Sequence, residues 1–319
     1  MENTNVAAEA ESNQPVVAKV ERVDFATTLN DVWQLAQTKI WNLLGIYLIV
    51  TLFTIIAIIF ATIVAFIVGF IINLAGIPAL LVAFLALALI ALIALIFWLS
   101  AMMLIASLKS LDSAGNPSVL ELVSEAKSQS WALVPTMVIA MFAVLGGFAL
   151  FIVPGIIMFV STAFVVNVAV LEKKSTWEAI VRSRDLVRGR WWNLFILWIG
   201  LGIAAALIIA ATGMSYSPLM LIIYPLSTIF SYVVYKKLAS LPAAKPATTR
   251  GDWYYKVAAG VGIALVAAGL IAIIFAASTN WDEFKAGFDE GFNEGKSEKY
   301  EDSYSKNYYD EPRMDYYVE

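Results

Sequence analysis

The sequence contains no cysteine and no histidine among its 319 residues. Without cysteine there is no disulfide framework, no thiolate nucleophile and no thiolate metal ligand. Without histidine the chain lacks the side chain that most often serves as general base or metal ligand. Only the carboxylates of Glu172, Glu178 and Asp185 lie near the apolar segments as reactive groups. We therefore expect no enzyme, no metal and no cofactor, and an intramembrane enzyme built on these carboxylates is a rival hypothesis.

Charged side chains are also missing from seven long apolar segments. Hydrophobic residues make up 61% of the chain, against about 45–50% in a soluble domain. About 20 consecutive apolar residues suffice to cross a bilayer as a helix. The sequence therefore predicts an all-α, polytopic transmembrane helical bundle with about seven spans. The predicted spans are residues 44–72, 79–108, 131–153, 155–171, 191–212, 219–235 and 257–277.

The charges that remain are distributed unevenly. The formal net charge is −4, but residues 278–319 alone carry −7. The other sixteen lysines and arginines all fall before the first span or in the connections 109–130, 172–190 and 236–256. Positive residues mark the cytoplasmic side of membrane proteins. This distribution predicts a cytoplasmic N-terminus and a C-terminal tail outside.

These segments predict five regions and their partners. They are a disordered N-terminus (1–23), a six-helix membrane domain (24–239), a basic linker (240–256), a seventh transmembrane helix (257–277) and an acidic, tyrosine-rich tail (278–319). We expect membrane lipids as partners, and a protein partner for the tail. Nucleic acid is not expected, because the chain lacks the basic patch that such binding requires.

A pattern of helix cap and tryptophan recurs three times along the membrane domain. A hydroxyl residue followed three positions later by an acid is typical of a capping box at a helix start. Tryptophan prefers the membrane–water interface, so each pattern predicts a cytoplasmic interfacial helix, an aromatic anchor and a hairpin of spans. Because both features are common, chance recurrence remains an alternative. The capping boxes are Thr28/Asp31, Ser118/Glu121 and Ser175/Glu178, and the anchors are Trp41, Trp131, Trp191 and Trp192.

Pro154 and Gly155 predict a helix break between the third and fourth spans. Proline is well tolerated at a helix start, so this dipeptide fits the turn between two antiparallel helices. The alternative places the turn at Gly146 and Gly147 and makes Pro154 a kink within the fourth span.

Small residues spaced four apart occur in two of the later spans. They are Gly200 with Ala204, and Ala258 with Gly262. Such pairs permit helices to approach closely in a membrane. Because small residues are frequent in any membrane helix, the pattern predicts close packing only weakly.

The connection 172–190 carries the densest positive charge of the chain. On a helix, Ile180 and Val187 share an apolar stripe with Arg184. Arginines at such a position bind anionic lipid headgroups. The alternative is that the cluster only fixes topology, with Arg184 extending to water. The candidate headgroup ligands are Arg182, Arg184, Arg188 and Arg190.

The segment from residue 152 to residue 193 carries a family resemblance. It contains Ile-Val-Pro-Gly-Ile-Ile from residue 152, a glutamate at 172 directly after an apolar span, and Ser183-x-x-Leu186-x-x-Gly189. This resembles the bacterial membrane domain that precedes the catalytic domain in some glycerophosphodiester phosphodiesterases, and related uncharacterised inner-membrane proteins. The resemblance implies a multi-pass protein of the bacterial inner membrane, with the catalytic domain absent.

Together these observations predict a non-catalytic membrane protein that organises or senses the bilayer, binding anionic lipid at the basic segment. Two alternatives remain. An uncoupled carrier or lipid translocator would use neutral polar groups such as Asn167, because the spans offer no titratable group for coupling. An accessory subunit of a membrane complex would use the C-terminal tail.

Overall fold

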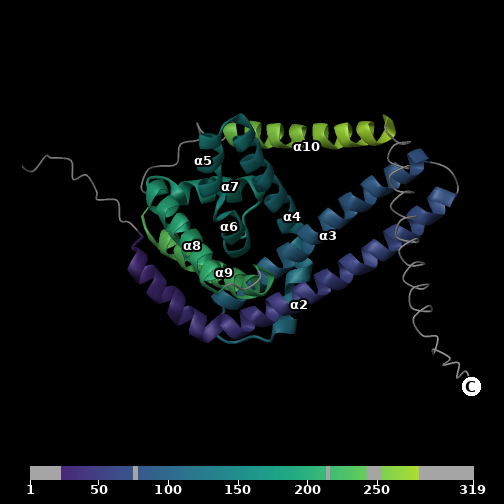
Figure 1. The fold of residues 1–319 in the computed structure, drawn as a ribbon. Helices are drawn as coiled ribbons and strands as arrows, with labels where there is room; N and C mark the ends of the chain where they lie inside the picture. The colour runs from purple at the N-terminus through teal and green to yellow at the C-terminus, as the bar shows by residue number, and fades with distance from the viewer. Residues whose placement is uncertain (1–22, 75–77, 213–215, 243–252, 280–319) are drawn as a thin grey trace, which may run out of the picture. The chain divides into compact units, whose positions relative to one another are not determined.

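The described residues of the computed structural model, 23–74, 78–212, 216–242 and 253–279, are almost entirely helical and contain no strand. This confirms the all-α class, and Figure 1 shows the helices in chain order. The predictions made for residues 1–22 and for the tail after residue 279 concern residues outside the described part of the chain. The helices are α2 (Phe25–Leu74), α3 (Pro78–Asp112), α4 (Val119–Leu150), α5 (Ile152–Thr162), α6 (Val165–Leu171), α7 (Thr176–Val187), α8 (Trp191–Thr212), α9 (Tyr216–Ser240) and α10 (Trp253–Thr279).

Several helices have the length and composition of membrane spans. Within the described residues five segments qualify alone, in α2, α3, α4, α5 with α6, and α10. A sixth qualifies if α7 and α8, which meet at an angle of 95°, form one broken span. The sequence predicts about seven. The expected sixth span falls on α9, which contains Pro225 and ends in a basic turn at Lys237.

The chain divides into two compact units. The first contains Met1–Ile59 and Leu92–Leu265, and the second contains Phe60–Ala91 and Val266–Glu319. In the second unit large apolar side chains such as Phe60 and Phe66 are exposed, as expected of side chains that face lipid. The first unit holds the buried apolar core and all of the polar contacts described below.

Two of the three predicted caps lie at helix starts, and one of them is a complete capping box. The Ser118 side chain accepts from the Glu121 N–H at 3.2 Å before α4. Before α7, Ser175 and Glu178 form a complete capping box. The prediction for Thr28 is wrong, because Asp24 accepts from the Thr27 N–H at 2.9 Å and starts α2 one turn earlier. Thr28 therefore lies inside the helix.

The first two predicted interfacial helices are not separate elements. α2 runs through Trp41 and α4 runs through Trp131 without a break. Neither sequence has glycine or proline between its cap and its tryptophan, so nothing interrupts the helix there. Only the third unit breaks, at Gly189, whose φ of 82° is a left-handed conformation that glycine adopts without strain.

The chain reverses between α4 and α5 at Phe151, which is extended, so Pro154 and Gly155 lie in the first turn of α5. The turn is therefore formed neither by Pro154 and Gly155 nor by Gly146 and Gly147. Instead, a Cβ on Gly147 would lie 3.1 Å from the Cα of Gly155. The glycines therefore permit the two antiparallel helices to approach closely beside the reversal.

A second close approach joins α4 to α10. A Cβ on Gly146 would clash with the carbonyl of Ala258, and one on Gly262 would clash with the carbonyl of Phe142. The predicted small-residue pair Ala258 and Gly262 is thus a helix contact. It brings the first turns of α10 beside the last turns of α4. The charge distribution places those two ends on opposite membrane sides, so the structure and the predicted sidedness differ at this point.

Candidate functional site

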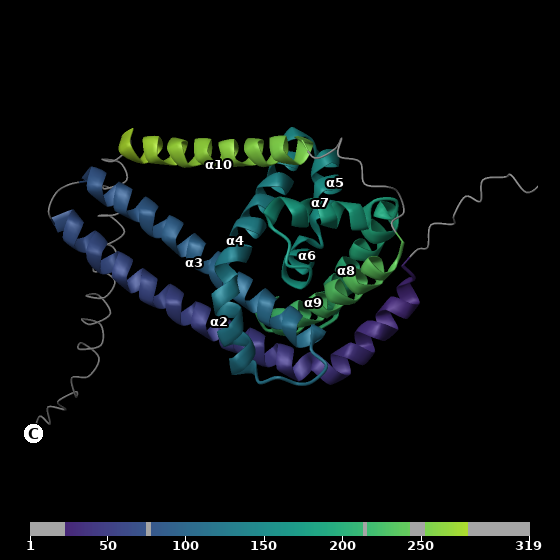
Figure 2. The ribbon, with the colours of Figure 1, turned by 180° about the vertical axis from the view of Figure 1, so that it is seen from behind.

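The amphipathic helix α7 is packed into the protein instead of lying on its surface. It crosses the break between α5 and α6, as Figure 1 and Figure 2 both show. The break leaves backbone groups of Ser161 and Phe164 without partners inside a helix. The Ser183 side chain forms hydrogen bonds with both of them. Its hydroxyl donates to the Ser161 carbonyl at 2.8 Å and accepts from the Phe164 N–H at 3.2 Å. These bonds fix the rotation of α7 and therefore the direction of its arginines.

The buried face of α7 is the predicted apolar stripe. Ile180 and Val187 are each 1% exposed, and Arg184 is 9% exposed on the same face. The stripe packs against side chains of α5, α6 and α8. Arg184 is thus held inside the protein, where a guanidinium is costly to place without polar neighbours.

The four predicted lipid ligands separate into two pairs. Arg182 binds Glu172, with its Nε 3.1 Å and 3.2 Å from the two carboxylate oxygens, and Tyr235 donates to the same carboxylate at 3.1 Å. Arg190 is 4% exposed and donates to the Pro242 carbonyl at 2.9 Å. Both arginines tie the segment around α7 to α9 and the residues after it, so we assign them a structural role.

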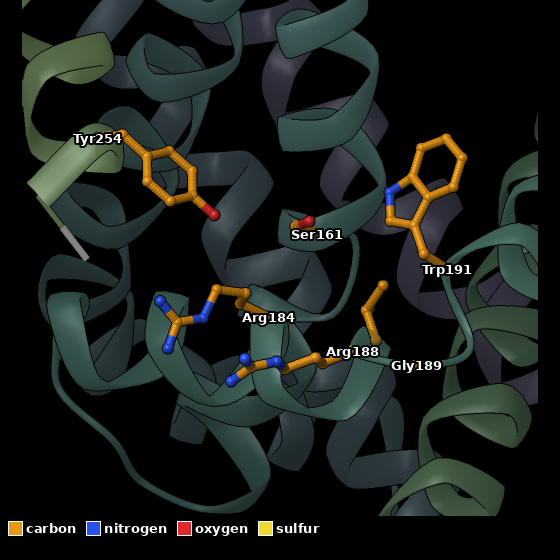
Figure 3. A pocket seen from close by; sticks show the side chains of 7 residues that line it. Ser161, Arg184, Arg188, Gly189, Trp191 and Tyr254 are labelled. Carbon is orange, nitrogen blue, oxygen red and sulfur yellow. The ribbon is translucent and has the colours of Figure 1, made fainter. Parts of the chain in front are cut away.

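Arg184 and Arg188 instead line a pocket of about 280 Å³. Their guanidinium groups project in the same direction, Arg184 from the last turn of α7 and Arg188 from the residue directly after it (Figure 3). Ser161 and Tyr254 line the same pocket, and the Tyr254 hydroxyl points inward (Figure 3). Arg184 also forms an ion pair with Asp185, at 3.1 Å between Nη2 and Oδ1.

Trp191 is part of this pocket, although the sequence predicts a membrane anchor. Its ring stacks on Phe195 with centroids 5.0 Å apart and meets Trp192 edge-on at 4.8 Å. Its indole N–H is buried and has no hydrogen-bond partner among the described residues. Buried polar groups usually have a partner, but the indole N–H groups of Trp98 and Trp198 are also buried without one, so this donor alone does not mark a binding site.

The other predicted anchors are highly exposed, as interfacial tryptophans should be. The exposed fractions are 77% for Trp41, 64% for Trp131 and 69% for Trp192. Sequence reasoning missed Ser161 and Tyr254 as pocket residues. The aromatic cluster at residues 253–255 is the only signal that could have suggested Tyr254.

The helix that carries the arginines starts at a charged cap. The side-chain and backbone hydrogen bonds from Ser175 hold the pKa of Glu178 below its ordinary value. Glu178 is therefore ionised at neutral pH, which suits the N-terminus of a helix. Among the described residues no cluster of three or more acidic side chains could hold a metal ion.

One comparison with known proteins gives a match. The model of a family described as a domain of unknown function (DUF7847) matches residues 117–280, just over half of the chain. The matched segment includes every residue of the pocket around Arg184. No curated protein and no solved structure matches. The resemblance to phosphodiesterase membrane domains therefore stays a prediction.

Proposed function

We propose that the protein, which belongs to the DUF7847 family, is a non-catalytic component of a bacterial cell membrane that organises or senses the bilayer. It does so by binding the headgroup of an anionic phospholipid in the pocket of Arg184 and Arg188. The observation that carries the proposal is that Arg184 and Arg188 line one small cavity together with the hydroxyl residues Ser161 and Tyr254.

The chemistry of the pocket suits a phosphate group. Guanidinium groups donate charge-assisted hydrogen bonds to phosphate oxygens in a fixed planar geometry. The residues Ser161 and Tyr254 add neutral hydroxyl groups to the lining of the same space. A pocket of about 280 Å³ accommodates a headgroup but not a whole lipid. The acyl chains would then remain in the surrounding bilayer.

The position of the pocket links lipid binding to the helix arrangement. Its side chains come from α5, α7, α8 and α10, so one headgroup would contact four helices. A ligand that binds only the folded arrangement stabilises it in proportion to its concentration above Kd. The protein would therefore be more stable in membranes rich in anionic lipid, which is the physical basis of a sensing or organising role.

The test compares two arginines on the same helix. Arg188→Gln removes a pocket charge, and Arg182→Gln removes an equal charge that binds Glu172 outside the pocket. Native mass spectrometry of the detergent-purified protein would measure retained phosphatidylglycerol against phosphatidylcholine. Losing a charged hydrogen bond of about 1.5 kcal/mol weakens binding about tenfold. We expect that loss for Arg188→Gln and little change for Arg182→Gln.

Equal phosphatidylglycerol retention in the two variants would show that the pocket does not bind the headgroup. The arginines would then only determine the membrane topology. Movement of labelled lipid between leaflets of liposomes by the purified protein would favour the lipid translocator instead.

A further inference from the structure

The three repeated units, each a helix cap followed by a tryptophan, contact one another in the fold. At two of these contacts, called junctions below, an asparagine side chain forms hydrogen bonds with the backbone of another unit. Asn42, directly after Trp41, donates to the Pro117 carbonyl at 3.2 Å. Asn193, directly after Trp192, accepts from the Val23 N–H at 3.1 Å and donates to its carbonyl at 3.2 Å. In each case the asparagine of one unit binds the backbone just before the cap of another unit.

In both cases the residue that the asparagine contacts directly precedes a helix cap. Pro117 precedes Ser118, which caps α4, and Val23 precedes Asp24, which caps α2. The first unit thus contacts the start of the second, and the third contacts the start of the first. A cyclic arrangement leaves one junction, between the second unit and the start of α7.

Residues at this third junction occupy equivalent positions. Leu133, which follows Trp131-Ala132, is as buried as Leu43 and Leu194 in the other two units. Further along α4, the Thr136 hydroxyl lies 3.1 Å from that of Thr176, the first residue of α7. The second unit therefore contacts α7 as the cyclic order requires, but position 132 holds alanine where the other units hold asparagine.

A cavity of about 640 Å³ lies at this junction. Ala132 lines it, together with Lys173, Lys174 and Ser175 at the start of α7. The volume is in the ordinary range of small-molecule sites, roughly 300–1,000 Å³. Where asparagine closes the other two junctions, the alanine methyl group leaves the backbone before α7 open to a ligand.

The backbone at Lys173 supports a binding role. Its φ is 54°, the only positive φ of a non-glycine residue in the described part of the chain. Lysine disfavours this left-handed conformation, and such residues cluster at functional sites. Lys174 lies 3.9 Å from Glu172, a loose ion pair, and both lysines line the cavity.

The remaining lining is mixed, with aliphatic side chains such as Ile105, Leu133 and Val170 beside the polar side chains of Ser128, Gln129, Thr136 and Thr176. Adjacent Trp131 is 64% exposed, as a residue at the membrane interface would be. A site that combines two lysines and several hydroxyl groups with aliphatic side chains suits an anionic amphiphile. We infer that the third junction binds an anionic phospholipid, whose phosphate group occupies the place that asparagine fills in the other two junctions. This inference is independent of the pocket at Arg184.

The first test closes the junction. Ala132→Asn introduces the amide that the other units use, so it should displace the lipid without unfolding the protein. We expect phosphatidylglycerol bound at this site, counted by native mass spectrometry, to fall at least about fivefold, with an equal or higher melting temperature. In wild-type protein two lipids should be retained. Ala132→Asn and Arg188→Gln should each lose one, and the double variant both. Unchanged retention in a stable Ala132→Asn protein would overturn the inference.

The second test separates binding from backbone strain. Lys173→Gly relieves the left-handed conformation while removing the charge, so it should raise the melting temperature and still weaken lipid retention. Lys173→Gln should weaken retention equally, whereas Lys127→Gln, an exposed lysine of α4 outside the cavity, should not. If Lys173→Gly is stabilised and binds as wild type, Lys173 is no ligand and the inference fails. This test remains decisive if Ala132→Asn does not fold.

Inorganic phosphate distinguishes the two sources of the same anionic group. We expect phosphatidylglycerol, but not inorganic phosphate alone, to raise the melting temperature in a manner that depends on Lys173. An equal, Lys173-dependent increase with inorganic phosphate would replace the lipid by a free phosphate ligand and overturn the assignment.

Discussion

The Ser183 hydroxyl donates to the carbonyl of Ser161 at 2.8 Å, joining α7 to the end of α5. It also accepts from the Phe164 N–H, so one fully buried side chain satisfies two backbone groups at a helix break. Because Arg184 follows directly in the sequence, this joint determines where the pocket arginines point. The pocket depends on a serine that has no contact with its cavity.

Replacing Ser183 by alanine should therefore destabilise the protein. Two buried backbone groups would lose their partners, at a cost of about 1–3 kcal/mol for each unsatisfied group. Thermal unfolding in detergent, followed by circular dichroism, measures the change. Ser124→Ala on the exposed face of α4 is the matched control and should change stability by less than about 0.5 kcal/mol. Equal melting temperatures for the two variants would contradict the role of the joint.

Glycine 155 should tolerate no side chain, while Gly202 should accept one. A Cβ at Gly155 would lie 2.8 Å from the Cα of Phe148, so Gly155→Ala forces the α4–α5 hairpin apart. At Gly202 nothing lies within 4 Å, and alanine favours a helix by about 0.5–1 kcal/mol over glycine. We expect a lower melting temperature for Gly155→Ala and an equal or higher one for Gly202→Ala. If the melting temperature changed in the same direction in both variants, the contact within the α4–α5 hairpin would not be tight.

Much of the fold follows from local sequence, because local rules determine it. The caps at Ser118 and Ser175 need only a hydroxyl and an acid three residues apart, and the apolar segments need only length. The cap predicted at Thr28 is wrong because Asp24, one turn earlier, offers an equally good cap. Local patterns cannot separate two equivalent caps, and tertiary contacts decide between them.

The candidate site was predictable only in part, for a different reason. Sequence reasoning found the arginine cluster and placed Arg184 in an apolar stripe, but it did not predict that Arg184 is buried within the protein. It could not divide the cluster, because the partners of Arg182 and Arg190 include Glu172 and the Pro242 carbonyl, which no helical spacing reveals. Likewise, Trp191 and Trp192 are adjacent and chemically identical, and only packing places one in the pocket and the other toward lipid.

The Glu178 cap should make stability depend on pH. Its pKa is lowered in the folded protein by the hydrogen bonds from Ser175, so its contribution is complete above the unfolded pKa, about 4.3. That contribution is lost as the pH falls through the lower folded pKa. Between about pH 5 and pH 3 the melting temperature should fall more for wild type than for Glu178→Gln. Parallel pH profiles would show that the ionised cap does not contribute.

The disagreement over sidedness at α4 and α10 can be resolved with single cysteines, because the natural chain has none to remove. Ser124 is exposed near the start of α4, and Phe151 is 77% exposed at the reversal after it. If α4 crosses the bilayer as its length and the charge distribution predict, Ser124→Cys reacts with a membrane-impermeant maleimide only from the cytoplasmic side. Phe151→Cys should then react only from the opposite side. Labelling of intact cells and of inverted vesicles measures the reactivity of each cysteine from the two sides.

Reaction of both cysteines from the cytoplasmic side would mean that α4 and α5 enter and leave the membrane on one face. The contact of Gly146 with Ala258 would then agree with a cytoplasmic start of α10, and the charge-based count of spans would fall by two.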